Sequence, residues 1–333
     1  MKPNIIHLIG DKLVGGSNLY VKSLMASRLK DTYNFHVCRL EELSSILKKI
    51  APQRPEVLVF HYPCTWQTIF TLLKLKLKLK SKIILIEHNY CEGFEQNQVP
   101  SLFRFRWMLK LNYGLVDRWL GVARGQKQWI IKRKLVAEEK LRVIPLSTSG
   151  STRLEDLLSV SPKQPGKPFV LGAYGRFARQ KGFDLLLKAM ALIPAEEFCL
   201  RLGGYGFDAE ELAELAEDLP QVKLVGAVKD VPGFLAQCDA VIVPSRWEPG
   251  GTVCLEIKAA AKPLIAPDID CFPEHVEGCG LLFPPNDCEQ LAATITSLKE
   301  QDLSSLGKKA RASVANSWEP FLDSWDMLLQ ELL

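Results

Sequence analysis

The chain has 333 residues, of which 47% are hydrophobic and 24% are charged. This balance excludes a disordered, collagen-like or coiled-coil protein, and at roughly 100–200 residues per domain the length predicts two domains with real cores. A membrane-spanning helix is excluded as well, because no stretch approaches the roughly 18 uncharged apolar residues that such a helix needs.

The net charge of +4 conceals two halves of opposite sign. Residues 1–163 contain 27 Lys and Arg against 13 Asp and Glu, which gives a net charge of +14. Residues 164–333 contain 15 against 25, which gives −10. Such an asymmetry predicts that the first half faces an anionic partner, either nucleic acid or a membrane surface.

The nine cysteines are scattered and none forms a C-x-x-C pair, which argues against a disulfide scaffold or a zinc site. Buried, reduced thiols in a cytosolic protein are the expected arrangement. The first apolar run ends at Gly10 and Asp11 and is too short for a signal peptide. We therefore expect a cytoplasmic protein, which would be peripheral on the inner face of a membrane if its basic half binds lipid.

Short apolar runs alternate with longer helical segments along the whole chain, which is typical of βα units on a parallel sheet. In the first half we expect strands at 5–9, 57–61, 83–88, 119–123 and 141–145, and helices near 17–30, 66–80, 101–114 and 125–137. In the second half we expect strands at 169–174, 198–203, 223–225, 240–243 and 263–266, and helices at 183–192, 209–218, 231–237 and 252–261.

Two loop-forming stretches separate these halves. A Ser/Thr/Gly run at 147–152 is followed by a Pro/Gly/Lys run at 161–168, after which the βα alternation restarts. We place the domain boundary after residue 163, with a second domain at 164–316. Two consecutive doubly wound domains are predicted, and such domains bind ligands at the carboxyl ends of their strands.

The segment 243–256 carries the sharpest chemical pattern, V-P-S-R-W-E-P-G-G-T-V-C-L-E. Gly250 and Gly251 lack side chains, so backbone N–H groups at the following helix start can approach a phosphate or sugar oxygen. Glu248 and Glu256, with seven residues between them, suit the hydroxyls of a polyol. Two isolated carboxylates at this spacing would more often be solvated charges, but their setting in P-S-x-x-E-P-G-G-T favours a ligand site.

This segment resembles the E-x7-E signature of the retaining, GT-B-fold glycosyltransferases of family GT4, which use nucleotide sugars. Further ordered similarities to that family lie at 175–182, 202–206, 225–230, 238–245, 273–275 and 280–285. The resemblance implies a GT-B fold, in which two Rossmann-like doubly wound parallel-sheet domains flank an interdomain cleft. It also implies that a last helix, at 317–333, packs back on the first domain.

Arg176 and Lys181 follow a predicted strand end, where two cations suit a diphosphate. A solvated basic loop is the alternative. The resemblance implies that both side chains hold the β-phosphate of the donor, and that Thr252 and the neighbouring amides complete this cradle.

The resemblance also implies roles around the rest of the donor. Glu256 would bind the nucleotide ribose, and Glu248 would contact hydroxyls of the transferred sugar. The base would lie near Gly204 and Val228.

The first half resembles the family more loosely. Gly15 and Gly16 stand where the family has a Gly-Gly loop beneath the donor phosphates, although a plain tight turn explains such a pair equally well. Histidines 7, 61 and 88 lie at or near predicted strand ends. His88 resembles the family histidine that approaches the donor sugar and its phosphate. His61 is a weaker candidate for an acceptor-side contact, since a strand-end histidine is more often structural.

Asp268 and Asp270 form a D-x-D sequence like the metal motif of the other glycosyltransferase fold, GT-A. They lie late in the chain, after a complete βαβ set, so we interpret them as a loop and expect no bound metal. Walker A is absent, and no G-x-G-x-x-G follows the first strand, which weakens a dehydrogenase interpretation.

The predicted function is therefore that of a retaining, hexosyltransferase-type glycosyltransferase with a UDP- or GDP-sugar donor and no other cofactor. The acceptor would be a hydroxyl of a glycan or lipid-linked molecule, in cell-envelope polysaccharide or lipopolysaccharide synthesis. Two alternatives stay open, a GT-B-fold nucleotide-sugar epimerase and a non-catalytic nucleotide-sugar-binding partner protein.

Two basic stretches supply much of the excess charge of the first half. Leu and Lys alternate from 72 to 80, and Phe, Arg, Trp and Lys mix at 103–111, with a further basic run at 132–134. As a helix, the first stretch places Lys76 and Lys80 almost opposite each other, so it shows no clean apolar face. Lysines over Leu suit an anionic bilayer surface, and a solvated helix is an equal alternative. We expect no nucleic acid partner, because no aromatic-stacking module is visible.

Overall fold

A computed structural model describes residues 2–10, 16–39, 47, 50–147, 152–161 and 166–333. The chain divides into two compact units. Unit 1 comprises Met1–Ser149 and Trp318–Leu333, and unit 2 comprises Gly150–Ser317. The sequence places the boundary after residue 163, whereas the helix α7 (Thr152–Leu158) lies in unit 2 and packs against other helices of that unit.

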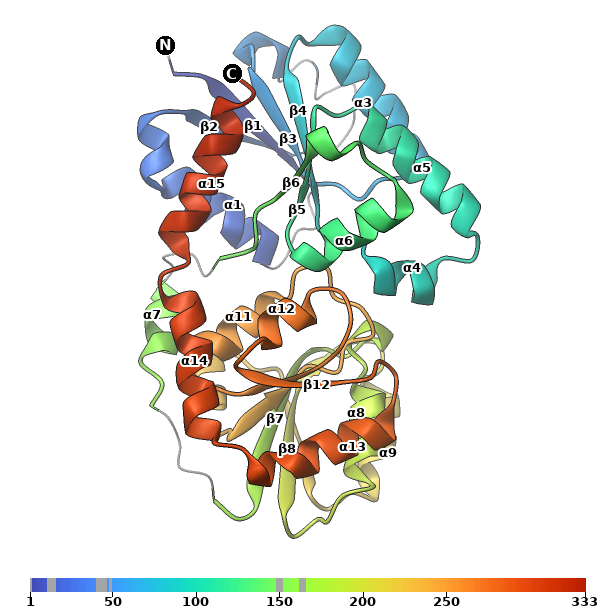
Figure 1. Ribbon diagram of the computed structural model, residues 1–333, viewed down its shortest axis with the longest axis vertical. Coiled ribbons are helices and arrows are strands. Elements are labelled where there is room, and N and C mark those ends of the chain that lie inside the picture. The colour runs from blue at the N-terminus through green and yellow to red at the C-terminus, as the bar shows by residue number, and fades with distance from the viewer. Residues whose placement is uncertain (1, 11–15, 40–46, 48–49, 148–151, 162–165) are drawn as a thin grey trace. The chain divides into compact units, whose positions relative to one another are not determined.

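Unit 1 contains a six-stranded, fully parallel sheet in the order β2-β1-β3-β4-β5-β6 (Figure 1). Its strands are β1 (Asn4–Ile9), β2 (Asn34–Arg39), β3 (Val57–Phe60), β4 (Lys82–Glu87), β5 (Arg118–Gly121) and β6 (Leu141–Val143). Its helices include α1 (Gly16–Ala26), α3 (Trp66–Lys78), α4 (Glu92–Gln98), α5 (Leu102–Gly114), α6 (Arg124–Arg133) and α15 (Trp318–Gln330).

Helices cover both faces of this sheet because its central strands are apolar on both sides, as parallel strands normally are. Leu72 of α3 and Trp129 of α6 pack against one face. Residues of α1 and α15 pack against the other, where Trp325 is fully buried and its Nε1 donates a hydrogen bond to the Tyr20 hydroxyl at 2.8 Å. The last helix of the chain therefore completes the core of the unit in which the chain begins.

Unit 2 contains a second six-stranded parallel sheet, in the order β9-β8-β7-β10-β11-β12. Its strands are β7 (Phe169–Arg176), β8 (Phe198–Tyr205), β9 (Val222–Gly226), β10 (Ala240–Ile242), β11 (Leu264–Pro267) and β12 (Gly280–Phe283). Its helices include α7, α8 (Phe183–Met190), α9 (Ala209–Glu217), α10 (Val231–Ala236), α11 (Thr252–Ala259), α12 (Phe272–Val276), α13 (Cys288–Thr296) and α14 (Leu303–Ala315).

Numbered within unit 2, this strand order is 3-2-1-4-5-6, the order of doubly wound nucleotide-binding domains. The winding reverses between β7 and β10, which are adjacent in the sheet. Ligands of such sheets bind outside the carboxyl ends of the strands at this reversal point. The loops that follow β7 and β10 are therefore where a ligand site is expected in unit 2.

The predicted fold class, two Rossmann-like α/β domains with parallel sheets, is confirmed. Two strands were not predicted from the sequence, β2 and β12, and each lies at one edge of its sheet. β2 mixes polar with apolar residues, so it lacks the continuous apolar run that reveals a central strand. β12 is apolar but has only four residues, Gly280–Phe283, and three of them are partly or fully exposed. Seven of the nine cysteines are buried, and none of the nine forms a disulfide. Within the described residues, none of the helices has the length and hydrophobicity needed to cross a bilayer.

Candidate functional site

In unit 2, the loops after β7 and β10 pack directly against each other. The first loop contains a short 3-10 turn, Arg179–Lys181, and reaches Gly182, whose φ of 65° lies in the left-handed region. A β-carbon on Gly182 would come within 2.2 Å of the Pro244 carbonyl oxygen in the second loop. Only glycine fits both the backbone angle and this close approach.

Lys181 and Glu248 form an ion pair across these two loops. The Nζ–Oε2 distance is 2.5 Å, and each side chain is 15% exposed. Glu248 is held from behind, because its backbone N–H donates to Oδ2 of Asp270 at 3.1 Å. Gln180 adds a further link by donating from Nε2 to the Trp247 carbonyl at 3.1 Å. The sequence-predicted Lys181 and Glu248 are thus brought together at the reversal point of the sheet.

The amino terminus of α11 follows Glu248 by only a few residues. Its cap is Gly251, whose φ is 65°, and a β-carbon there would lie 2.9 Å from Nε2 of His275. The same His275 nitrogen donates to the Gly250 carbonyl at 3.1 Å. Thr252 is exposed at the first position of the helix. In the first turn the Cys254 N–H already donates to the Gly251 carbonyl at 2.9 Å. The amino terminus of a helix, where the first N–H groups have no carbonyl four residues earlier in the helix, is the usual setting for an anion.

Glu256, one turn inside α11, accepts a hydrogen bond from the Tyr174 hydroxyl at 2.8 Å. This bond ties the helix to the end of β7. On the other side of β7, Gly204 pairs with Gly175 so closely that a β-carbon on Gly204 would lie 2.1 Å from the Gly175 carbonyl oxygen. Val228 lies against the adjacent Gly203, and its Cγ2 would be 2.3 Å from a β-carbon there.

The other predicted residues of these loops are placed less tightly. Arg176 ends β7 with an exposed side chain, whose Nη2 lies 3.5 Å from Oε1 of Gln180. In unit 1, Gly16 begins α1, and Gly15 lies outside the described residues.

Three histidines form a hydrogen-bonded chain at the carboxyl side of the unit 1 sheet. Nδ1 of His7, in β1, lies 2.9 Å from Nε2 of His61, which follows β3. Nδ1 of His61 lies 3.1 Å from Nε2 of His88, which follows β4. The rings of His61 and His88 stack with 10° between their planes. The two histidines singled out from the sequence are therefore in contact, and His7 extends them inward.

All three imidazoles are held neutral. Burial lowers the pKa of His7 to about 3 and that of His88 to about 4. The pKa of His61 also lies well below its usual value, chiefly because of burial and further because of the charges that its neighbours would carry. A neutral imidazole has one donor and one acceptor nitrogen, so the chain must point one way.

The direction of this chain follows from its buried end. Nε2 of His7 is buried and has no hydrogen-bond partner among the described residues. A bare acceptor in that position costs less than an orphaned N–H, because unpaired buried donors are the rarer case. We therefore assign donation from His7 to His61 and from His61 to His88. His88 then carries its own proton on Nδ1, the nitrogen turned away from the chain.

Sequence reasoning missed several residues that support these groups. Tyr174, Gln180 and His275 were not singled out, and Asp270 was considered only as a metal-motif decoy. In the structure Asp270 orients the Glu248 backbone. The sequence motif at 243–256 identifies candidate residues within one loop. It gives no signal for the residues of other segments that contact them. Among the described residues there is no cluster of three or more His, Cys, Asp or Glu side chains that could hold a metal ion.

Comparison with known proteins gives this geometry a context. Residues 156–316 match the family model described as "Glycosyl transferases group 1". The chain is 34% identical over 142 residues to the lipopolysaccharide core biosynthesis glycosyltransferase LpsD of Rhizobium meliloti, a match that covers 41% of this chain and 40% of LpsD. The chain spans less than half of the length of the first such curated relatives.

Solved structures share the fold along the whole chain. Sucrose-phosphate synthase from Thermosynechococcus elongatus superposes with a TM-score of 0.79 and 20% identity, and 99% of each chain is covered. The Anabaena protein HepE, in complex with UDP and glucose, gives a TM-score of 0.72 and 17% identity over 98% of this chain and 99% of HepE. At these identities the likeness establishes the two-domain Rossmann-like fold of GT-B glycosyltransferases.

Proposed function

We propose that this protein is a retaining glycosyltransferase that moves a sugar from a nucleoside diphosphate sugar to a hydroxyl of a glycan or lipid-linked acceptor. One observation carries the proposal. The Lys181–Glu248 ion pair lies where the winding of the unit 2 sheet reverses, a few residues before the amino terminus of α11. This arrangement offers positive charge for a diphosphate and a carboxylate for sugar hydroxyls within one small region.

The ion pair holds the Lys181 ammonium group in a position where it could also bind a phosphate. This ammonium group has three N–H donors, so it can keep the Glu248 carboxylate and still donate to a phosphate oxygen. Positive charge that is already in place costs no reorganisation when negative charge develops on the leaving group. Arg176 and the α11 amides would add donors around the same diphosphate.

The chemical step breaks the bond between the anomeric carbon and the β-phosphate oxygen. The acceptor oxygen bonds to the same carbon from the same face, and the acceptor proton passes to the departing phosphate oxygen. The products are the glycosylated acceptor and the nucleoside diphosphate. Glu248 would hold the sugar through its hydroxyls, and Glu256, fixed by Tyr174, would accept from the nucleotide ribose. The roles of His88 and His61 toward the sugar and the acceptor stay predictions.

Two features narrow the substrates to be tested. HepE binds UDP and glucose, which supports testing UDP first among the donors. LpsD acts in lipopolysaccharide core biosynthesis, which supports an envelope glycan as the acceptor class. We expect neither a metal ion nor another cofactor to be required.

Thermal unfolding in the presence of UDP, GDP, ADP and NAD tests the donor class directly. A nucleotide that binds only the folded protein raises the unfolding midpoint, and above Kd the stabilisation grows with the logarithm of the nucleotide concentration. We expect a shift with UDP or GDP that disappears in Lys181→Ala. A shift with NAD alone would contradict the proposal, and release of the nucleoside diphosphate from its sugar conjugate would distinguish an enzyme from a silent binding partner.

A further inference from the structure

Helices α3 and α5 of unit 1 carry apolar side chains on their outer faces. In α3 these are Trp66, Phe70, Leu73 and Leu77, of which Phe70 is 65% and Leu77 is 75% exposed. At 100° per residue they fall within about 60° of one another, opposite the buried Leu72 and Leu75. The helix thus has two apolar faces. The Leu-Lys alternation hid them, because the helix ends at Lys78 and leaves Lys80 outside it.

The outer face of α5 continues this surface. Phe103, Trp107 and Leu111 recur every four residues and are 73%, 49% and 44% exposed. Phe103 and Trp107 lie edge to face, with ring centroids 6.1 Å apart. Together with Trp66 of α3 they line a shallow groove. We call the seven residues Trp66, Phe70, Leu73, Leu77, Phe103, Trp107 and Leu111 the outer apolar surface.

The two helices are fixed side by side (Figure 1). Thr68 of α3 donates to Oδ1 of Asn112 in α5 at 2.7 Å, and Nδ2 of Asn112 donates to the Thr65 carbonyl at 3.1 Å. Asn112 is fully buried between them. The outer apolar surface is therefore a single patch whose two helices are held in a fixed arrangement.

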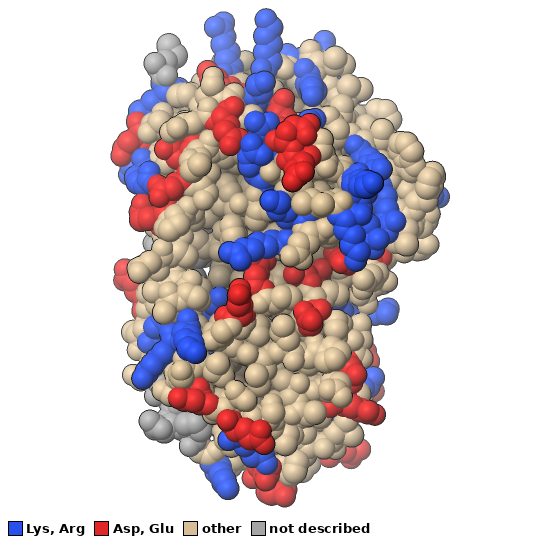
Figure 2. Space-filling view, in the orientation of Figure 1, with Lys and Arg blue, Asp and Glu red and all other residues tan. Residues whose placement is uncertain are grey.

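Positive charge surrounds this patch. The stretches 66–82 and 99–116 contain no Asp or Glu. Lys74 and Lys76 flank the apolar stripe of α3 on opposite sides, and Arg104 and Lys110 flank that of α5. Among the described residues, Lys74, Arg104 and Lys110 pair with no carboxylate. Figure 2 shows Lys and Arg atoms gathered beside an uncharged surface at this side of unit 1.

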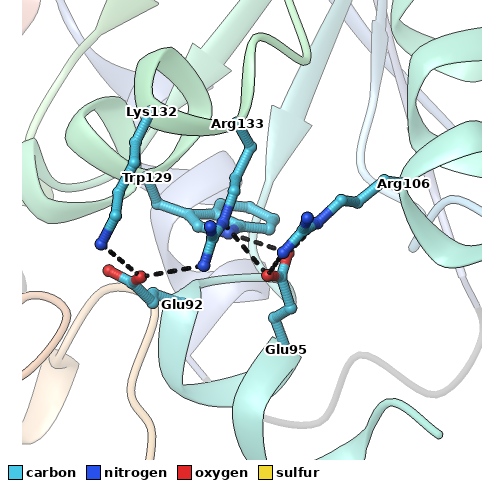
Figure 3. A network of polar contacts seen from close by, with 6 residues as sticks. All are labelled: Glu92, Glu95, Arg106, Trp129, Lys132 and Arg133. Atoms are coloured by element: carbon cyan, nitrogen blue, oxygen red, sulfur yellow. Dashed lines mark hydrogen bonds and ion pairs between the residues drawn. The ribbon is translucent and has the colours of Figure 1, made fainter. Parts of the chain in front are cut away.

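The two acidic residues of the neighbouring α4, Glu92 and Glu95, are already paired with cations. Glu95, which is buried, pairs with Arg106 of α5 and lies 3.2 Å from Nε of Arg133, and it accepts from Nε1 of Trp129 at 3.1 Å (Figure 3). Glu92 pairs with Lys132 at 2.9 Å. This network anchors α4, α5 and α6 to one another and leaves the cations of the outer face without local acidic partners.

We propose that the outer apolar surface docks on an anionic lipid bilayer. An anionic bilayer offers partners for both kinds of side chain. Aromatic and leucine side chains enter the boundary between headgroups and acyl chains, while Lys and Arg remain among the anionic headgroups. A second copy of the chain fits less well, since a two-fold interface through this patch would place its cations against each other. Docking goes beyond the proposed glycosyltransferase reaction, because it requires neither donor nor turnover.

Flotation of the full chain with vesicles tests the proposal. We expect binding to phosphatidylcholine vesicles that contain phosphatidylglycerol to be at least tenfold stronger than binding to phosphatidylcholine alone, and to weaken as salt is raised. Equal binding to both vesicles, or binding to neither, would overturn it.

Two variants and their matched controls locate the surface. Phe103→Ser with Trp107→Ser removes apolar area, and Lys74→Gln with Arg104→Gln and Lys110→Gln removes charge. Each should lower vesicle binding at least tenfold while UDP-induced thermal stabilisation stays unchanged. The controls Leu192→Ser with Met327→Ser, which are 58% and 65% exposed elsewhere, and Lys308→Gln with Lys309→Gln should bind like the unmodified chain.

The remaining outcomes are also decisive. If the patch variants retain vesicle binding, or if they instead abolish a concentration-dependent dimer seen by sedimentation, the bilayer is not the occupant. If neither UDP nor GDP stabilises the unmodified chain, the proposed function is contradicted. The vesicle experiment still tests the docking proposal, because it does not depend on nucleotide binding.

Discussion

The two units share an architecture but differ in the chemistry at the carboxyl ends of their strands. In unit 2 that edge combines an ion pair with a glycine-capped helix terminus, which suits a charged diphosphate. In unit 1 it presents three buried imidazoles that are all neutral. The two edges therefore suit different ligands. The edge in unit 2 suits an anion, and the edge in unit 1 suits uncharged groups that donate or accept hydrogen bonds.

Removing either member of the unit 2 ion pair should have the largest effect. We expect Glu248→Ala or Lys181→Ala to lower turnover roughly 100-fold or more, the usual loss when one preorganised electrostatic group is removed from a transition state. Release of nucleoside diphosphate from its sugar conjugate measures this loss. Glu214→Ala, on the exposed side of α9, is the matched control. Near-normal turnover in either ion-pair variant would remove unit 2 from the chemistry.

Acid should destabilise unit 1 more than unit 2. Histidines that stay neutral when folded gain protons on unfolding below pH 6.5, so stability falls as the pH is lowered through that value. Glu87 opposes this trend, because burial raises its pKa to about 7 and it binds a proton in the folded state. The three histidines together outweigh the one carboxyl group. We therefore expect the free energy of unfolding of unit 1 to fall by about 3 kcal/mol between pH 7 and pH 5.

Tryptophan fluorescence during urea unfolding follows this loss, because six of the seven tryptophans lie in unit 1 and only Trp247 lies in unit 2. Unit 2 contains a single comparable histidine, His275, whose pKa burial lowers to about 4. A fluorescence midpoint that does not move between pH 7 and pH 5 would show that the neutral histidine chain is not maintained.

The glycine cap of α11 offers a sharper test of unit 2. Gly251→Ala combines a left-handed φ of 65° with a β-carbon 2.9 Å from His275, so we expect a loss of about 2–3 kcal/mol in unfolding free energy and weaker UDP binding. Gly226→Ala has a similar φ of 70° and open space around the new atom, so about 1 kcal/mol is expected. Equal losses in both variants would mean that the packing of His275 against the cap is unimportant.

His61→Phe should have the smallest effect. The substitution keeps an aromatic ring, which is somewhat larger than imidazole, but both hydrogen bonds of the chain are lost, and His88 is no longer oriented. We expect turnover to fall about tenfold, the value of one hydrogen bond. Nucleotide-induced stabilisation should stay intact because unit 2 is untouched. A variant that loses nucleotide binding instead would contradict the division between the two edges.

The same contrast explains what the sequence could predict. The strand–loop–helix segments of unit 2 carry the candidate residues in continuous motifs, so Lys181 and Glu248, which the structure pairs, could both be selected from the sequence. The histidine chain joins β1, β3 and β4, which are separated by dozens of residues, and only the strand order brings His7, His61 and His88 together. His7 was noticed in the sequence but was not expected to belong to a network.

The sequence showed only the composition of the segments that form the outer apolar surface. The sequence predicted basic and aromatic stretches, but strict alternation of Leu and Lys gave no helical face. The face emerges once the helix limits are known and α5 is placed beside α3. Supporting contacts such as Tyr174–Glu256 and Asp270–Glu248 were likewise out of reach, since each joins segments through tertiary packing alone.

The position of α15 affects the order in which the two units can complete their folding during synthesis. Unit 2 ends at Ser317, so all of its residues have been synthesised before Trp318 begins the last helix. Unit 1 receives Phe321, Leu322 and Trp325, which are buried in its core, only after unit 2 has been synthesised. Residues 1–149 must therefore wait until all of unit 2 and then α15 have been synthesised before their core can close, and unit 2 is the first of the two units that can finish folding on the ribosome.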